Sequence, residues 1–286
     1  MDKETAKAMM TNIRKMYEPY KQKGTAANVR HIDTSYGKIR VLEYGFDNDD
    51  VRPLYVDIHG GGYCVGFPEM DEEINLMIMK STNVKIISID WPKAPENPYP
   101  IGQEATYEVI RHYYENAAEY KIDRDNIGIG GYSSGGNFAT VVPIKAKERS
   151  DLKIKYQVLF FPGVDIDTDP YDKKGSDKVL DREFLKAIHA CYLSEPEHSK
   201  HPYTSPRWAP RDMLVGLPPA FIILAGLDPL YAEGKDYGDK LKEAGVDVEM
   251  HNFEDADHGF TYMGNEDDKR KAYELMIDFI RRHSQR

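Results

Sequence analysis

Apolar residues follow two alternating patterns along this chain. Short runs rich in β-branched residues are separated by longer stretches in which apolar residues recur every three or four positions. The short runs predict buried strands and the longer stretches predict helices. Strands that alternate with helices are joined by parallel crossovers, so the pattern predicts an α/β protein whose mostly parallel central sheet has helices on both faces. The predicted strands are Ile39–Tyr44, Leu54–His59, Val84–Asp90, Ile127–Gly131, Tyr156–Phe161, Ala220–Ala225 and Val246–Phe253, and the predicted helices include Glu104–Tyr120, Asn137–Lys147, Tyr231–Ala244 and Asp268–Arg282.

The first predicted strand follows a turn at Tyr36-Gly37-Lys38 and another extended segment, Val29–Tyr36. We therefore expect the sheet to begin with an antiparallel hairpin.

Two segments do not follow the alternation of strands and helices. Residues 1 to about 24 carry Met9 and Ile13 at helical spacing, and residues 168–217 hold a helical pattern, Asp181–Leu193, followed by a proline-rich stretch. A connection as long as the second one is usually functional in a compact domain. We expect a single domain over residues 1–286, with both segments forming a cap over the carboxyl edge of the sheet. Ordinary core packing remains an equal alternative for the N-terminal helix.

Charge and composition narrow the classes of partner. The chain has 286 residues, with 38 basic and 48 acidic side chains and a formal net charge of −10. Such a charge repels nucleic acids and anionic membranes, so we expect neither as a partner. The longest nearly apolar stretch, Pro218–Leu227, is far shorter than the roughly 20 residues of a spanning helix. The charged N-terminal residues show no secretory signal, and the two cysteines, Cys64 and Cys191, suit free thiols, so we expect a cytoplasmic protein.

The most specific motif is Gly131-Tyr132-Ser133-Ser134-Gly135, which matches G-x-S-x-G between a predicted strand and a predicted helix. A serine presented on such a sharp turn needs neighbours without side chains, which glycine provides. The register is unambiguous, because a motif centred on Ser134 would need glycine at the position of Tyr132. The motif predicts Ser133 as a nucleophile and gives Ser134 a backbone N–H at the start of a helix. Taken alone, the motif also fits a chance glycine-rich turn.

A second motif, His59-Gly60-Gly61-Gly62-Tyr63, follows the predicted strand Leu54–His59. Three consecutive glycines leave backbone N–H groups uncovered, and such groups can form an oxyanion hole in an acyl-transfer enzyme. A flexible loop is the alternative. A phosphate-binding loop is disfavoured, since neither of the usual phosphate-binding glycine patterns is present.

Two further residues complete a catalytic order. Asp228 follows the strand Ala220–Ala225, and His258 follows the strand Val246–Phe253. Parallel strands end at the same edge of a sheet, so both side chains are expected near Ser133. The chain order Ser133, Asp228, His258 is the order expected of a serine hydrolase with this kind of sheet. His258 would accept the serine proton, and Asp228 would orient the imidazole.

These motifs together resemble the hormone-sensitive-lipase family of α/β-hydrolase esterases. The similarity runs from about residue 38 to the C-terminus and includes Asp228-Pro229-Leu230, His258-Gly259-Phe260 and the loop Ala94–Pro100. The chain departs from the family at the elbow, where Tyr132 and Ser134 replace the usual aspartate and alanine. The resemblance implies that Gly61, Gly62 and Ser134 supply the oxyanion N–H groups, and that the protein is a carboxylesterase for small ester molecules.

Aromatic residues beside the motifs bear on the substrate. Tyr63 and Phe67 flank the glycine loop, and Tyr262 follows His258. We expect them to line a short, closed acyl pocket that favours acetyl to butyryl esters. An amidase or aryl-formamidase would use the same three residues, and a ligand-binding protein that has lost catalysis is a further alternative. The sequence leaves a homodimer open.

No metal or cofactor is expected. His198 and His201 have a metal-like spacing, but no further ligands with zinc spacing accompany them. Asp165, Asp167 and Asp169 alternate like part of a calcium loop, but the glycine and terminal glutamate of that pattern are missing.

Overall fold

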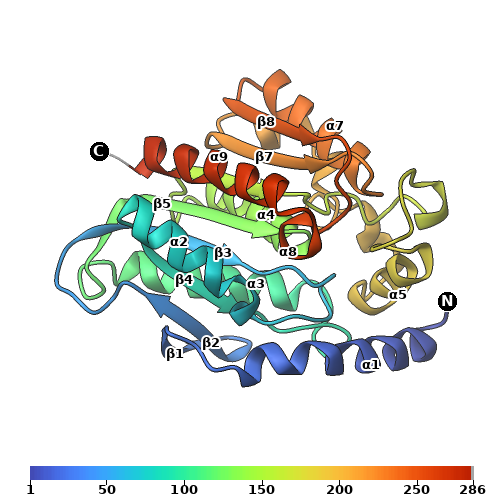
Figure 1. Ribbon diagram of the computed structural model, residues 1–286, viewed down its shortest axis with the longest axis horizontal. Helices are drawn as coiled ribbons and strands as arrows, with labels where there is room; N and C mark the ends of the chain where they lie inside the picture. Colours follow the sequence, from blue (N-terminus) through green and yellow to red (C-terminus); the bar gives the residue numbers. More distant parts are fainter. Residues whose placement is uncertain (285–286) are drawn as a thin grey trace.

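An eight-stranded sheet forms the centre of the protein, as the computed structural model of residues 1–284 shows (Figure 1). The strand order is β1-β2-β4-β3-β5-β6-β7-β8. The pairs β1·β2 and β2·β4 are antiparallel, and the other neighbouring pairs are parallel. The predicted α/β class and the opening hairpin are therefore confirmed. The strands are β1 (Asn28–Thr34), β2 (Gly37–Tyr44), β3 (Arg52–Ile58), β4 (Lys85–Asp90), β5 (Ile122–Tyr132), β6 (Tyr156–Phe160), β7 (Ala220–Ala225) and β8 (Val248–Phe253).

Helices cover both faces of the sheet, and two separate groups of buried apolar side chains mark the two faces. One group joins α2 (Glu72–Thr82) and α9 (Glu266–Ser284) to one face. The other joins α3 (Ile101–Glu115), α4 (Ser134–Arg149) and α7 (Tyr231–Glu243) to the opposite face. Shorter helical turns lie in the connections: η1 (Pro68–Asp71), η2 (Pro170–Asp172), η3 (Pro196–Lys200), η4 (Pro206–Trp208), α6 (Arg211–Leu214) and α8 (Phe260–Met263).

Two predicted element ends were wrong by five residues. The strand β5 begins at Ile122 rather than Ile127, because Ile122 pairs with Arg52 across an irregularity before the regular ladder starts. The helix α3 ends at Glu115 rather than Tyr120. Asn116 ends it, and the side-chain amide of Asn116 donates to the carbonyl of His112 at 2.8 Å. Polar side chains that bond to the nearby backbone in this way compete with helix continuation.

The two segments outside the alternation form helices that pack on each other. The helix α1 (Lys3–Gln22) and the helix α5 (Arg182–Tyr192) lie side by side at one end of the molecule (Figure 1). Each begins at an aspartate whose carboxylate accepts backbone N–H groups of the first turn, Asp2 for α1 and Asp181 for α5. No helix within residues 1–284 combines the length and the apolarity needed to cross a bilayer.

Candidate active site

Ser133 occupies a strained turn between β5 and α4. Its backbone has φ 55° and ψ −115°, a conformation that non-glycine residues adopt only where the surroundings enforce it. Here the Ser133 N–H donates to the carbonyl of Phe160 at 2.9 Å, which ties the turn to β6. A Cβ atom on Gly131 would lie 2.3 Å from the carbonyl oxygen of Gly135, and one on Gly135 would lie 2.0 Å from that of Ile58. Both positions of the motif thus require glycine for close backbone approach.

Ser133, His258 and Asp228 form a continuous chain of hydrogen bonds. The Nε2 atom of His258 lies 3.0 Å from the Ser133 Oγ, and its Nδ1 lies 2.6 Å from the Asp228 Oδ2. The other carboxylate oxygen of Asp228 accepts the N–H of Leu230 at 2.8 Å. Because a carboxylate only accepts hydrogen bonds, these contacts assign the imidazole proton to Nδ1 and leave Nε2 as an acceptor for the serine hydroxyl. The residues follow β5, β7 and β8, so the carboxyl edge of the sheet brings them together.

Uncovered backbone donors face the same space. Gly61 has φ +130° and Gly62 has φ +56°, and no backbone hydrogen bond within residues 1–284 uses the N–H of either one. Ser134 is the first residue of α4, so its N–H also lacks a helical partner. These three residues and Ser133 all line one cavity. The arrangement offers N–H donors beside the serine hydroxyl.

The cavity encloses about 950 Å³ of empty space, its open mouth included. The cap segments contribute Tyr17 from α1 and Phe184 and Ile188 from α5 to its wall. The apolar residues at positions 184, 185 and 188 recur at helical spacing, and this spacing could have identified the face of α5 that lines the cavity.

The three aromatic residues predicted for the pocket differ in position. Tyr63 and Tyr262 line the cavity, whereas Phe67 is absent from its wall. The Phe67 ring instead lies under the ammonium groups of Lys21 and Lys93, 5.0 and 5.3 Å from its centroid. Phe67 therefore packs against two cations instead of lining the cavity, which its proximity in sequence to the glycine loop did not predict.

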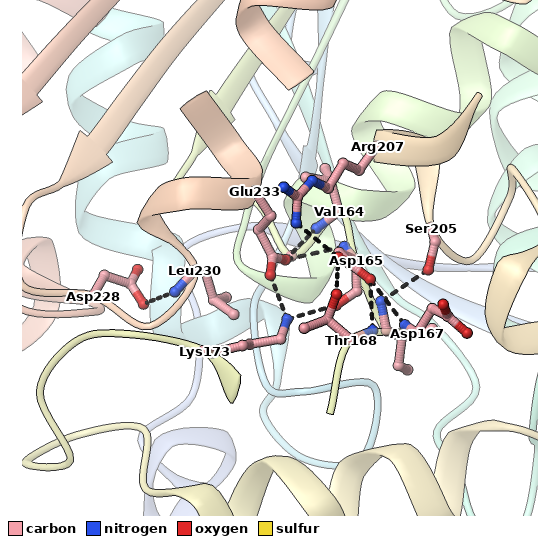
Figure 2. Close-up of polar contacts among 12 residues, drawn as sticks. Val164, Asp165, Asp167, Thr168, Lys173, Ser205, Arg207, Asp228, Leu230 and Glu233 are labelled. Atoms are coloured by element: carbon pink, nitrogen blue, oxygen red, sulfur yellow. Dashed lines mark hydrogen bonds and ion pairs between the residues drawn. The ribbon is translucent and has the colours of Figure 1, made fainter. Parts of the chain in front are cut away.

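Three charged residues that line the cavity, Asp165, Lys173 and Glu233, belong to a cluster of hydrogen bonds and ion pairs (Figure 2). The ammonium of Lys173, from the second cap segment, donates to the carbonyl of Asp165 at 2.6 Å and forms a short ion pair with Glu233 on α7. The other carboxylate oxygen of Glu233 accepts the backbone N–H groups of Val164 and Asp165. Burial raises the pKa of Glu233 to about 7, and the charge of Lys173 opposes this rise. No sequence pattern indicated this contact, which joins residues 60 positions apart.

Two buried carboxyl groups lie outside the cavity wall, Asp57 on β3 and Asp71 at the end of η1. Asp57 accepts hydrogen bonds from Asn75 at 2.9 Å and Ser88 at 2.5 Å, and Asp71 accepts the Tyr262 hydroxyl at 2.6 Å. Neither carboxyl has a salt-bridge partner within residues 1–284. Burial raises the pKa of Asp57 to about 6 and raises that of Asp71 as well.

The residues considered as metal ligands have other partners. His198 bonds the Ser194 hydroxyl at 3.0 Å, and His201 contacts the Tyr99 hydroxyl at 3.3 Å. Asp165 forms an ion pair with Arg207 at 3.0 Å. The described part of the chain, residues 1–284, has no group of three His, Cys, Asp or Glu side chains that could hold a metal ion.

Comparison with known proteins places this site in a family. The family model described as the alpha/beta hydrolase fold matches residues 55–262. The chain belongs to the α/β-hydrolase family. This α/β-hydrolase is also 32% identical over 214 residues to carboxylesterase NlhH of Mycobacterium tuberculosis, a match that spans 74% of this chain and 67% of that one.

Solved structures agree with this assignment. EstE1, a thermophilic carboxylesterase cloned from a metagenomic library, has a TM-score of 0.88 and 28% identity, and the match covers 98% of both chains. An esterase from Pyrobaculum calidifontis has a TM-score of 0.85 and 27% identity, over 98% of this chain and 93% of that one. The esterase relatives support the resemblance of this α/β-hydrolase to the hormone-sensitive-lipase type.

Proposed function

We propose that this protein is a carboxylesterase that uses Ser133 as nucleophile, His258 as general base and Asp228 as the residue that orients the base. The observation that carries the proposal is the unbroken hydrogen-bonded chain from the Ser133 hydroxyl through the His258 ring to the Asp228 carboxylate. The esterase relatives support the same reaction class.

The reaction follows from this geometry in two steps. His258 accepts the Ser133 proton on Nε2 while the serine oxygen attacks the ester carbonyl, and Asp228 stabilises the resulting imidazolium. His258 then gives the proton to the departing alcohol. A water molecule repeats the sequence on the acyl-enzyme and releases the acid.

The developing negative charge on the carbonyl oxygen is stabilised by backbone N–H groups. Gly61, Gly62 and Ser134 supply these donors, because each lines the cavity beside Ser133 and its N–H has no backbone partner among residues 1–284. Loss of one such donor commonly lowers kcat by about 10²- to 10³-fold.

The preferred substrates are small esters with acetyl to butyryl acyl groups. Tyr63 lines the cavity beside the glycine loop, and its ring stacks on that of Tyr192 with centroids 3.8 Å apart. Each accommodated methylene gains only about 0.8 kcal/mol, which a wall of packed rings easily outweighs. The proposal places the protein in the cytoplasm, with these small esters as its partners and neither nucleic acid nor membrane among them. It also includes assembly of the protein as a homodimer.

A panel of p-nitrophenyl esters from acetate to palmitate tests this function, with Ser133→Ala as the loss-of-nucleophile variant and Ser134→Ala as its matched control. We expect activity to peak at or below butyrate. Ser133→Ala should lose about 10⁵- to 10⁶-fold in kcat, and Ser134→Ala should lose far less because its backbone N–H remains. Equal losses in the two variants, or rates that rise through decanoate, would contradict the proposal. A matched p-nitroanilide panel separates esterase from amidase.

A further inference from the structure

The cap helix α5 presents one polar side chain to the cavity. Leu185 and Ile188 line the cavity with apolar side chains, and His189 lies on the same side of the helix, four residues after Leu185 and next to Ile188. Within residues 1–284 no hydrogen bond joins the imidazole of His189 to another group, although its backbone carbonyl accepts the N–H of Leu193. The cavity therefore contains an imidazole whose two ring nitrogens have unused bonding capacity.

Among residues 1–284, the charged groups that line the same cavity as His189 already have hydrogen-bond partners, with one exception. The Asp165 carboxylate accepts the N–H groups of Asp167 and Thr168, the Thr168 hydroxyl and the guanidinium of Arg207. Both oxygens of the Glu233 carboxylate also have donors. The ammonium of Lys173 has three N–H groups and uses two of them, on Asp165 and Glu233 (Figure 2). Among these groups in residues 1–284, one N–H of Lys173 and the two ring nitrogens of His189 remain free to form hydrogen bonds with a ligand.

The charges at this end of the cavity decide what kind of ligand fits. Glu233 pairs with Lys173, and Arg207 pairs with both Asp165 and Asp236, so each cation of the cluster already has a carboxylate partner and neither is left unpaired to bind a substrate carboxylate. Burial and the nearby charge of Lys173 lower the pKa of His189 to about 3, so its imidazole is neutral at physiological pH. A neutral imidazole offers one donor and one acceptor. A hydroxyl group also donates one hydrogen bond and accepts another, whereas a carbonyl can only accept.

We infer that His189, with Lys173, forms a subsite for a hydroxyl group of the substrate, so that the preferred esters carry a free hydroxyl on the acyl chain or on the alcohol. This inference rests on the proposed esterase function. His189 donates to or accepts from the hydroxyl, and Lys173 supplies a second donor. A purely apolar ester leaves the imidazole without a partner in a half-buried place, which costs free energy.

Two pairs of esters test the subsite, and in each pair a methyl group replaces the hydroxyl. Ethyl 3-hydroxybutyrate and ethyl 3-methylbutyrate place the difference on the acyl chain. 2-Hydroxyethyl butyrate and propyl butyrate place it on the alcohol. Hydrolysis is followed by pH-stat titration for the wild type, His189→Leu and His189→Asn, and the quantity compared is the ratio of kcat/KM within each pair.

We expect the wild type to favour the hydroxylated member of at least one pair by about tenfold, the value of one well-made hydrogen bond. His189→Leu should bring that ratio close to one. His189→Asn should restore most of it, because the amide also offers a donor and an acceptor. Lys186→Leu is the matched control, since Lys186 lies on the same helix but outside the cavity wall and pairs with Asp169. Its ratio should equal that of the wild type.

The outcomes separate this inference from the proposed function. If the wild type hydrolyses all four esters with no preference in either pair, the subsite is overturned and the esterase stands. The same holds if His189→Leu changes both members of a pair equally. If the wild type hydrolyses none of them, nor p-nitrophenyl butyrate, the esterase proposal itself fails. Should His189→Leu lack a cooperative thermal transition, the wild-type ratios and His189→Asn decide.

Discussion

Lys173→Met is the most informative perturbation of the segment 168–217, because it breaks a buried ion pair between this segment and α7. The side chains of Lys173 and Glu233 are only 5% and 3% exposed. Removing one partner of such a pair typically costs about 3–5 kcal/mol, since the remaining charge is left buried and unpaired. A carboxylate can escape this cost by binding a proton, so the loss must depend on pH.

The direction of that dependence follows from the pKa of Glu233. Burial already raises it to about 7, and loss of the Lys173 charge raises it further. Below pH 7 the carboxyl is protonated in both proteins, and the variant should lose about 1–2 kcal/mol. As the pH rises above 7, the wild type releases this proton and the variant retains it. The loss should then grow by about 1.4 kcal/mol per pH unit until it approaches the full cost.

Urea denaturation of the wild type and Lys173→Met at acidic, neutral and alkaline pH measures this loss. The double variant Lys173→Met/Glu233→Gln is the control, because glutamine carries no charge and can still accept the N–H groups of Val164 and Asp165. We expect it to be more stable than Lys173→Met at alkaline pH and similar at acidic pH. A loss of equal size at every pH, or a double variant without recovery, would refute the reasoning.

Two other predictions concern the centre of the molecule. Folding raises the pKa of Asp57 from 3.8 to about 6, so the protein takes up a proton on folding between these pH values, and the free energy of unfolding falls as the pH rises through them. Asp57→Asn should therefore raise the free energy of unfolding by about 1–3 kcal/mol near pH 8 and change it little near pH 4. Urea denaturation at the two pH values measures this difference. A Cβ atom on Gly62 would lie 2.4 Å from the Ile188 Cδ1 atom at φ +56°, so Gly62→Ala should displace the oxyanion N–H and lower kcat/KM by about 10²-fold, with partial recovery in the double variant with Ile188→Ala.

The fold and the candidate catalytic residues could be predicted from the sequence, because short segments of the chain specify them. The strand Ala220–Ala225 has the bounds that its apolar run predicted. Each candidate catalytic residue follows a strand, so the parallel sheet alone brings Ser133, Asp228 and His258 to one edge. The elbow glycines, Gly131 and Gly135, have no alternative that fits the backbone approach.

The wall of the cavity was harder to predict, because it depends on how residues 1–24 and 168–217 pack against the rest of the chain. Lys173 and Glu233 lie 60 residues apart, and both are residue types that are normally solvated, so no periodicity marks them as a buried pair. His189 lies within a helical pattern, and this pattern predicts the helix but does not predict which of its faces lines the cavity. Phe67 was predicted to line the cavity because it lies close to the glycine loop in sequence. Its ring instead packs against Lys21 and Lys93.

Covalent labelling with a fluorophosphonate, followed by peptide mass mapping, tests the central claim most directly. The reagent phosphonylates a serine only where a base activates it and N–H donors stabilise the oxyanion. The account predicts a single adduct on Ser133, its absence in Ser133→Ala, and a strongly slowed reaction in His258→Ala. An unlabelled wild-type protein that is folded, or an adduct on Ser134 in place of Ser133, would contradict it.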